Sequence, residues 1–337
     1  MEAGVIPMLV SVVVPMLNEE GNLRELYRRL AAVFEKLACD RRLIFVDDGS
    51  TDGSSKVIRE LAQGDPTVIG LRLSRNFGHE SASTAGLDVA AEAGSDAAIL
   101  MDADLQDPPE VIHELIARWK EGYGIVYAVR RQRRGETAVK RACAWAFYRL
   151  LNCLSDVKIP MDTGDFRLVD AKVLEAVRLC RERDRFVRGL VAWTGFDSIA
   201  VPYDRPARFA GKTNYRFWKL LFLSLDAAVG FSITPLRFAS ALGFIIMALS
   251  MAMALVIVIQ KLLVGIQVQG YALLTSGLFF LGGVQMLLLG ILGEYIGRIY
   301  RQTQGRPLYL VSEKITQKMQ DAHESEINEE SRVGSRR

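Results

Sequence analysis

The segment A-A-I-L-M-D-A-D-L-Q-D, residues 97–107, joins an apolar stretch to a group of carboxylates. Residues 97–101 predict a buried β-strand, which ends directly at Asp102 and Asp104. Two carboxylates at the carboxyl end of a parallel strand suit Mg²⁺ or Mn²⁺, because these ions prefer hard oxygen ligands and often take only one or two from protein. A polar loop that caps the helix opening at Pro108 is the structural alternative. Because a bare D-x-D motif is common by chance, the surrounding sequence decides between the two.

Apolar segments alternate with helical segments through the first part of the chain. Asn22, with Glu25 three residues later, predicts an N-cap and capping box for the first helix. Alternating strands and helices form a mostly parallel sheet with helices on both faces, and ligands bind at the carboxyl ends of its strands. The predicted strands are 9–14, 43–46, 68–73, 97–101 and 125–128, and the predicted helices are 23–37, 51–63 and 80–93.

A polar motif follows each of the first four predicted strands. The motifs are P-M-L-N-E-E at 15–20, D-D-G-S at 47–50, R-N-F-G at 75–78 and D-A-D at 102–104. The first is acidic, although a dehydrogenase would have there the G-x-G-x-x-G loop whose backbone amides hold a pyrophosphate. Carboxylates instead suit hydrogen bonds to a base imide and to ribose hydroxyls, with the phosphate charge neutralised by a metal ion. The sequence therefore predicts a metal-assisted nucleotide site at this edge of the sheet.

The C-terminal third contains two long apolar runs. No charged residue occurs in 238–260 or in 262–293. Because a helix needs roughly 20 apolar residues to cross the hydrocarbon core of a bilayer, we predict two transmembrane helices, Phe238–Gln260 and Tyr271–Gly293. The loop between them lies near Gly265–Gly270. Buried helices of a soluble domain are the alternative.

The charged residues around these runs predict an orientation. The connecting loop carries only Lys261, whereas many Arg and Lys residues flank the pair of runs, so the positive-inside rule places both termini in the cytoplasm. Residues 217–223 mix bulky apolar side chains with one Lys and predict a helix in the membrane interface, with a core helix as the alternative. After Leu310 the chain is polar and predicts a solvated or disordered tail. The net charge of +3 is too small to suggest nucleic-acid binding.

The ordered motif set, together with D-T-G-D-F-R-L at 162–168, resembles family 2 glycosyltransferases. More narrowly, residues 9–310 resemble the polyprenyl-phosphate glycosyltransferases, which include bactoprenol glucosyltransferases and dolichyl-phosphate mannose synthases. The resemblance implies an α/β fold of the GT-A, nucleotide-diphospho-sugar transferase type followed by two transmembrane helices. It divides the chain into a cytoplasmic catalytic domain (1–215), a juxtamembrane interfacial helix (216–236), a transmembrane hairpin (237–297) and a cytoplasmic C-terminal tail (298–337).

The resemblance also implies which residues bind the sugar donor. The nucleotide pocket would be lined by Pro15, Asn18, Glu20, Asp47 and Asp48. The donor diphosphate and a Mg²⁺ or Mn²⁺ ion would be held by Asp102, Ala103, Asp104 and Gln106, with Asp102, Asp104 and Gln106 as metal ligands. Turn or cap roles are the structural alternatives for Asp48, Ser50 and Asp52.

Three catalytic residues follow from the same resemblance. Asp165 would lie next to the reacting centre, and Arg130, just past the strand 125–128, would face a phosphate, with Arg131 as the competing candidate. Arg208 would meet the lipid phosphate together with Lys212. Lys212 stands where relatives usually have an acidic residue, so its role departs from the family pattern. Arg167 is expected to be a structural ion-pair partner.

The resemblance implies an inverting hexosyltransferase in the inner (plasma) membrane. It would move a hexose, with UDP-glucose as the first candidate donor, to polyprenyl (undecaprenyl) phosphate at the cytoplasmic face of a multi-pass protein. A GDP-mannose transferase like dolichyl-phosphate mannose synthase is the alternative enzyme, and a membrane scaffold that only binds nucleotide sugar is the alternative without catalysis. The partners are therefore the nucleotide sugar, the lipid and the membrane, with a homo-oligomer left open.

Overall fold

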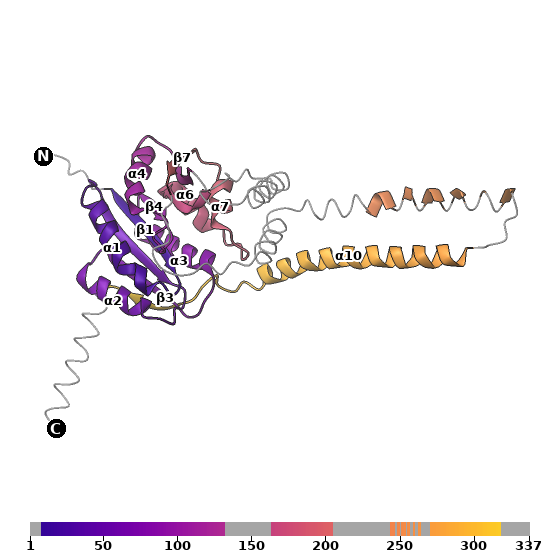
Figure 1. The fold of residues 1–337 in the computed structure, drawn as a ribbon, viewed down its shortest axis with the longest axis horizontal. Helices are drawn as coiled ribbons and strands as arrows, with labels where there is room; N and C mark the ends of the chain where they lie inside the picture. The colour runs from indigo at the N-terminus through magenta and orange to yellow at the C-terminus, as the bar shows by residue number, and fades with distance from the viewer. Residues whose placement is uncertain are drawn as a thin grey trace, which may run out of the picture. The chain divides into compact units, whose positions relative to one another are not determined.

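The computed structural model describes residues 8–131, 163–204 and 270–317, together with most residues between 243 and 263. These residues divide between two compact units (Figure 1). The first contains the β-sheet with its helices and also the segment that follows residue 305. The second contains the long helix α10 and the described residues between 243 and 263. All strand-end motifs belong to the first unit.

Four parallel strands form the centre of the sheet and confirm the predicted α/β class. They are β1 (Leu9–Met16), β2 (Asp40–Asp47), β3 (Val68–Leu73) and β4 (Ala97–Leu100), in the order β4-β1-β2-β3. Seven consecutive residues of β1 are buried, which is typical of a parallel strand covered on both faces. On one face Val12 and Val14 lie in a core with α1, α2 and α4, and on the other Val13 packs with α3 and α6.

The outer strands make the sheet mixed. Strand β6 (Thr163–Asp170) runs antiparallel to both β4 and β5 (Ile125–Arg130), and β7 (Ser198–Tyr203) runs parallel to β5. Leu100 pairs with Arg167, so the N-terminal end of β6 lies beside the carboxyl end of β4. This reversal brings Asp165 to the same edge of the sheet as Asp102, although 63 positions separate them in the sequence.

The helices follow the predicted order with shifted ends. Helix α1 is Glu20–Phe34, α2 is Ser54–Gly64, α3 is His79–Glu92, α4 is Ile112–Lys120 after a 3₁₀ turn η1 (Pro109–Val111), α6 is Ala171–Leu179 and α7 is Val187–Trp193. The predicted N-cap Asn22 is wrong. Glu19 occupies that position, and Asn22 is buried in the first turn, where its side-chain amide donates to Glu19 at 2.5 Å. The earlier start follows because Ser54 accepts a hydrogen bond from the Glu19 backbone and fixes it against α2.

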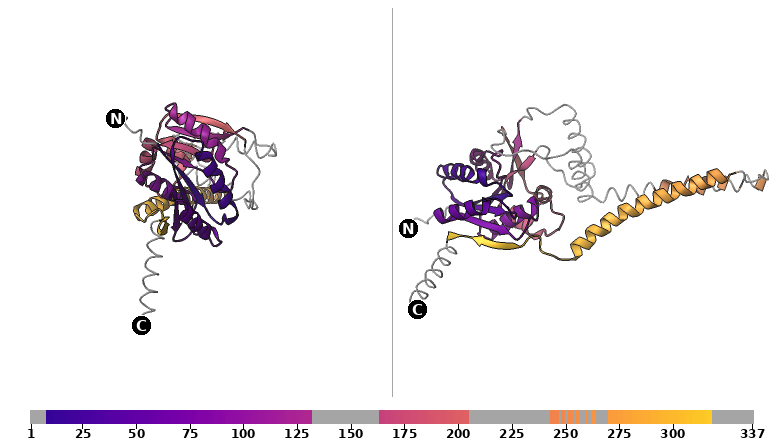
Figure 2. Two further views of the ribbon diagram at one scale, coloured as in Figure 1. Left: turned by 90° about the vertical axis from the view of Figure 1, so that its left-hand side faces the viewer. Right: turned by 60° about the horizontal axis from the view of Figure 1, so that its bottom comes forward.

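The segment after Leu310 is not wholly the solvated tail that its polarity suggested. Residues Val311–Ile315 form β8, which pairs antiparallel with β3 at the edge of the sheet. Figure 2 shows β8 as a yellow strand. Ile315 is buried against the core, and Arg59 holds Glu313 through two hydrogen bonds of 3.1 and 2.7 Å. A short edge strand that buries one side chain has too little apolar alternation to be recognised in sequence.

Helix α10 (Tyr271–Thr303) begins at the residue predicted for the second span and continues ten residues beyond its expected end at Gly293. Among the described residues it contains the one segment, Phe280–Thr303, that is long and apolar enough to cross a membrane. The first predicted span, Phe238–Gln260, is helical where it is described but is described only in part. The two-span hairpin and the boundaries at 215, 236 and 297 therefore stay predictions.

Candidate active site at the carboxyl edge of the sheet

The loops after β1 and β2 are bonded to each other through Asn18 and Glu20. The Asn18 backbone N–H donates to the Ser50 hydroxyl at 2.9 Å, and its side-chain oxygen accepts from the Thr51 N–H at 2.8 Å. Asn18 has φ +57°, a left-handed conformation that Asn tolerates better than most residues. The Glu20 carboxylate accepts from the Gly53 N–H at 2.9 Å. Both side chains are exposed, and Pro15 is buried near the end of β1.

The carboxylates of Asp47 and Asp48 are buried and bonded to nearby backbone. Asp47 accepts from the Ser50 N–H at 2.7 Å and from the Ser55 hydroxyl. Asp48 accepts from the N–H groups of Phe77 and Gly78 at 2.7 and 2.9 Å, which fastens the R-N-F-G loop to the end of β2. Burial raises the pKa of Asp48, although these backbone hydrogen bonds oppose the shift. These contacts give Asp48 a structural role at the end of β2, and its contact with the nucleotide stays a prediction.

The D-A-D-L-Q-D segment forms a tight loop after β4. The buried Asp104 accepts from the Gln106 N–H at 3.1 Å, while Leu105 adopts φ +60°, which is rare for a residue with a branched side chain. The buried Asp107 closes the loop: it accepts from the Tyr203 hydroxyl at 2.8 Å and from the Asp102 N–H at 3.4 Å. Ala103 is buried, and the Asp102 side chain keeps about a third of its surface exposed (32%).

Asp165 joins this loop to α3 and α7. Its two oxygens accept from Nε and Nη2 of Arg188 at 2.6 and 2.8 Å. Nε2 of His79 lies 3.3 Å from Asp165 Oδ2 and 3.8 Å from Asp102 Oδ1, so the imidazole stands between two carboxylates. The buried Arg167 donates to the backbone carbonyls of Gly164 and Asp165 at 2.7 and 3.2 Å, and its Nη2 lies 4.0 Å from Asp165 Oδ1.

These contacts move the protonation equilibria in opposite directions. Burial alone would raise the pKa of Asp165, but Arg188 and His79 outweigh it and hold that pKa well below its usual range. Burial, followed by the charge of Asp107, raises the pKa of Asp102 to about 7. Burial alone would lower the pKa of His79, but Asp165 and Asp102 outweigh it and raise the pKa to about 9. The site is thus a mixture of one firmly ionised carboxylate and one carboxylate crowded by like charges.

A divalent cation fits the residues present. One atom each from His79, Asp102 and Asp165 lies within 4.8 Å of the others, and Asp104 and Gln106 follow on the same loop. The paired contact with Arg188 already occupies Asp165, so Asp102 is the best-placed donor of the three. A bound cation would relieve the like charge that surrounds Asp102, and carboxylate and amide oxygens are the donors that Mg²⁺ and Mn²⁺ prefer.

Comparison with known proteins identifies the family. The Glycosyl transferase family 2 model matches residues 11–178. The uncharacterized glycosyltransferase sll0501 of Synechocystis sp. is 46% identical over 90% of this chain and 95% of its own length. The chain belongs to glycosyltransferase family 2.

Other relatives narrow the type. The prophage bactoprenol glucosyl transferase homolog of Escherichia coli is 39% identical over 90% of this chain and 98% of its own length. The bactoprenol glucosyl transferase of Shigella phage SfII is 40% identical over 90% and 97%. They confirm the predicted polyprenyl-phosphate glycosyltransferase type and hence an enzyme. A crystal structure of glucosyl-3-phosphoglycerate synthase from Mycobacterium tuberculosis gives a TM-score of 0.45 at 19% identity, over 66% of this chain and 78% of that one, a likeness too distant to inform the site.

Several residues of the site in this family 2 enzyme were not predicted from the sequence. His79 follows the R-N-F-G motif directly, so its position at a strand end was a usable signal. Arg188 lies in R-F-V-R-G, residues 185–189, which has no strand-end position to mark it. Glu80, whose pKa is raised by burial, accepts from the Val187 N–H at 2.8 Å and ties α3 to α7.

Two of the arginines predicted to bind phosphate, Arg130 and Arg131, are among the described residues. Arg130 is the last residue of β5, so the strand extends two residues past its predicted end, and its backbone pairs with Tyr203. Arg131 follows it with an exposed side chain. Arg208 and Lys212 lie outside the described residues, and their roles stay predictions.

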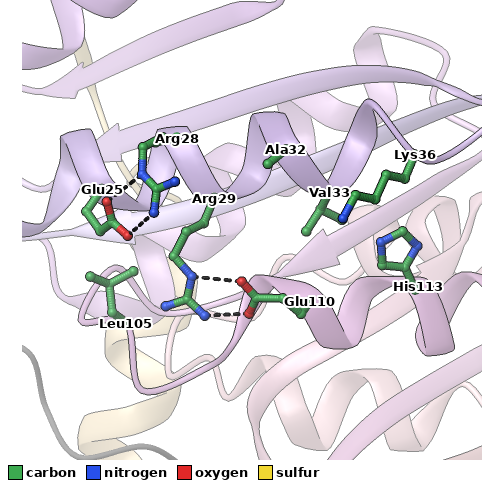
Figure 3. Close-up of a pocket in the computed structure, with 9 residues that line it drawn as sticks. All are labelled: Glu25, Arg28, Arg29, Ala32, Val33, Lys36, Leu105, Glu110 and His113. Atoms are coloured by element: carbon green, nitrogen blue, oxygen red, sulfur yellow. Dashed lines mark hydrogen bonds and ion pairs between the residues drawn. The ribbon is translucent and has the colours of Figure 1, made fainter.

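A cavity of about 360 Å³ lies between α1 and the segment formed by η1 and α4 (Figure 3). Its charged side chains include two ion pairs drawn there, Arg28 with Glu25 and Arg29 with Glu110. The hydrophobic part of its lining includes Leu105 of the loop after β4. The pairing of these side chains accounts for four of its charges without any ligand.

Proposed function

We propose that the enzyme transfers a hexose from a nucleotide-diphosphate sugar to polyprenyl phosphate at the cytoplasmic face of the plasma membrane, with inversion of the anomeric centre. The observation that carries the proposal is the group formed by Asp102, His79 and Asp165 at the carboxyl edge of the sheet. UDP-glucose is the proposed donor, because bactoprenol glucosyl transferases are among the relatives at 39–40% identity.

The donor would bind across the ends of β1, β2 and β4. Asp102, Asp104 and Gln106 would hold Mg²⁺ or Mn²⁺, and a bound ion would supply Lewis-acid neutralisation of the leaving diphosphate. The exposed side chain of Asn18 stands where a base or ribose could reach it, together with Glu20. We propose that Asp47 and Asp48 act on the nucleotide through the loops that they hold, because their carboxylates are already bonded to backbone and to Ser55.

The acceptor needs little help from a base. A phosphate monoester has a second pKa near ~6, so at neutral pH it is mostly dianionic and already nucleophilic. Asp165 is held ionised by Arg188, so it would orient the reacting groups and stabilise positive charge at the anomeric carbon. Arg130, Arg208 and Lys212 would bind phosphate oxygens.

The exposed apolar surface of α10 supports a place in the membrane. Its side chains include Leu278, Phe280, Met286 and Leu289, each at least 60% exposed. Lipid would cover such a surface, and the isoprenoid tail of the acceptor would stay in the same bilayer. We propose that α10 and residues 238–260 cross the membrane as a hairpin with both termini cytoplasmic.

Purified full-length protein, incubated with undecaprenyl phosphate and a panel of UDP-glucose, GDP-mannose and other nucleotide sugars, tests the proposal. We expect one donor to give a glycosylated lipid product, with UDP-glucose the most active. Transfer from GDP-mannose alone would support the mannose synthase alternative. Nucleotide-sugar binding without transfer, after correction for hydrolysis, would support the scaffold and overturn the proposal.

Labelling tests the membrane arrangement. A Cys introduced at Gln267 should react with an impermeant reagent in intact cells, and one at Ser325 should not, because only the loop near 265–270 would be outside. The reverse pattern would refute the orientation.

Replacing Arg208 tests the acceptor side. Arg208→Ala should lower kcat/KM for polyprenyl phosphate by about ten- to a hundred-fold, because a hydrogen bond to a charged group contributes roughly 1.5–3 kcal/mol. Donor affinity should hardly change. An equal loss of donor affinity would assign Arg208 to the donor diphosphate instead.

A further inference from the structure

The carboxylate of Asp165 is engaged on both oxygens by one side chain. Arg188 donates from Nε and Nη2 at 2.6 and 2.8 Å, the two-point geometry that the planar guanidinium gives and an ammonium cannot. Asp165 is buried and Arg188 is only partly exposed, so water competes weakly for these bonds. Arg188 therefore restrains both the rotation and the position of the carboxylate.

Arg188 is itself anchored at the start of α7. The N–H of the preceding residue, Val187, donates to Glu80 Oε2 at 2.8 Å, and Glu80 belongs to the first turn of α3. His79, the first residue of α3, contacts Asp165 Oδ2 at 3.3 Å. Arg167 Nε donates to the Asp165 backbone carbonyl at 3.2 Å. Asp165 is thus fixed from three elements, α3, β6 and α7.

We infer that Arg188 is a positioning residue for glycosyl transfer, which holds the Asp165 carboxylate turned toward His79 and beside Asp102. This inference rests on the proposed function for the reaction that it supports. Arg188 acts through Asp165, and its own side chain needs no contact with the donor or the acceptor. Without it the Asp165 carboxylate loses its two shortest hydrogen bonds and can turn to any cation near Asp102.

We expect the loss of Arg188 to lower kcat more than it changes KM. A misplacement of about 1 Å in a reacting group can lower a rate about a hundred-fold while substrate binding persists. We therefore expect Arg188→Ala to lower kcat by about a hundred-fold and to change the KM for the nucleotide sugar by less than about threefold. Arg188→Lys, which keeps the charge and one donor, should recover at least about tenfold of the loss.

The chain offers a matched control. Arg181 also makes a two-point contact with a buried carboxylate, through Nη1 and Nη2 to Asp88 at 2.7 and 3.0 Å, outside the candidate site. Arg181→Ala should lower the melting temperature about as much as Arg188→Ala but leave kcat within about threefold of the wild type. If both variants lose the same activity, Arg188 is only a stabilising residue and the inference is wrong.

A double variant separates positioning from direct contact. If Arg188 acts through Asp165, then Asp165→Asn combined with Arg188→Ala should be no less active than Asp165→Asn alone. Losses that multiply would show that Arg188 touches a substrate itself, which overturns the inference. Should Arg188→Ala fail to fold, the same cycle is measured with Arg188→Lys, whose single-point contact still distinguishes the two outcomes.

The order of measurement separates this inference from the proposed function. Wild-type transfer to undecaprenyl phosphate is measured first, and its absence overturns the proposed function. The Arg188 and Arg181 variants are then compared in metal-dependent hydrolysis of the nucleotide sugar, which needs no lipid acceptor. A deficit of Arg188→Ala relative to Arg181→Ala in that assay supports the inference, and equal hydrolysis by the two variants contradicts it.

Discussion

The two halves of the site edge use the same residue type for different purposes. At the ends of β1 and β2, the carboxylates of Asp47 and Asp48 accept hydrogen bonds from backbone N–H groups and a hydroxyl of neighbouring loops. At the ends of β4 and β6, Asp102 and Asp165 face His79 and Arg188, and Asp102 is crowded by further carboxylates. In the first half the carboxylates stabilise the loops around them. In the second half Asp102 is surrounded by like charge, which a bound metal ion would neutralise.

The contrast shows why a motif residue at a strand end is not automatically a ligand. A carboxylate that satisfies two buried N–H groups stabilises the fold, and its removal leaves those groups without partners. A carboxylate among other carboxylates destabilises the empty site and gains from a cation. Stability and activity should therefore respond differently to substitutions in the two halves.

The largest effect is expected at the D-A-D loop. Asp104→Ala should lower kcat by roughly three orders of magnitude, about 4 kcal/mol of transition-state stabilisation, because it removes a carboxylate that we propose binds the cation of the donor diphosphate. The variant should still fold and insert, which circular dichroism and membrane fractionation check. Chelation should abolish wild-type transfer as well. Full turnover in excess chelator would sink the metal assignment.

A substitution in the other half should act first on stability. Asp48→Ala removes the acceptor for the Phe77 and Gly78 N–H groups and should lower the free energy of unfolding by about 2–4 kcal/mol. Urea denaturation of the detergent-solubilised protein measures this. Asp48→Asn, which keeps one acceptor oxygen, should fall between the alanine variant and the wild type. If a variant is as stable as the wild type but inactive, Asp48 binds a ligand and does not mainly stabilise the fold.

Asp102→Asn should give the opposite sign. Burial and then the like charges of Asp107, Asp165 and Asp104 disfavour the ionised form of Asp102 and outweigh the opposite charge of His79, so removing its charge should stabilise the metal-free protein by about 1 kcal/mol at neutral pH. Melting temperatures in chelator measure the gain. Added Mn²⁺ should raise the wild-type melting temperature more than that of the variant, since ligand binding stabilises the folded state. A loss of stability in chelator would show that the two halves do not differ as described.

The smallest effect is expected at the exposed Asp52, which lies in the loop after β2 and accepts a hydrogen bond from the start of α1. Burial alone would raise its pKa, but hydrogen bonds from Ser54 and from the Glu20 N–H outweigh it and lower that pKa. The ionised form therefore contributes stability above the ordinary value of 3.8, which disappears as the pH falls below it. Asp52→Asn should cost about 0.5 kcal/mol at pH 7, because solvent screens the group, and progressively less as the pH falls below 3.8. A cost that grows toward low pH would contradict this.

Much of the fold was predictable because apolar strand segments alternate regularly with helical segments along the sequence. The β-branched run at 10–14 and the alternation with helices identified β1 to β4 within a few residues, and the polar motifs at their ends located the edge that carries the site. Strand β8 escaped because Val311–Ile315 buries a single side chain, and α1 was placed late because Asn22 looked like a cap. The position of β8 and the start of α1 both depend on tertiary contacts, which local sequence patterns do not reveal.

The site was predictable in its carboxylates but not in their partners. Asp102 and Asp165 stand in recognisable motifs, whereas Arg188 meets Asp165 only because β6 runs antiparallel to β4 and α7 packs nearby. His79 differs, since it directly follows a motif already identified at a strand end. Contacts that depend on strand direction require the topology, and a single sequence does not supply it.

The pairing of β8 with β3 has a practical consequence for dissecting this enzyme. The polypeptide that forms α10 is preceded and followed by segments of one sheet, so cutting the chain before α10 to obtain a water-soluble fragment also removes β8. The backbone of Val68–Leu73 would then present an open row of N–H and C=O groups, a template for pairing with another molecule. A soluble fragment that behaves as a monomer should therefore retain residues 306–317, rejoined through a short linker, rather than end where the catalytic motifs end.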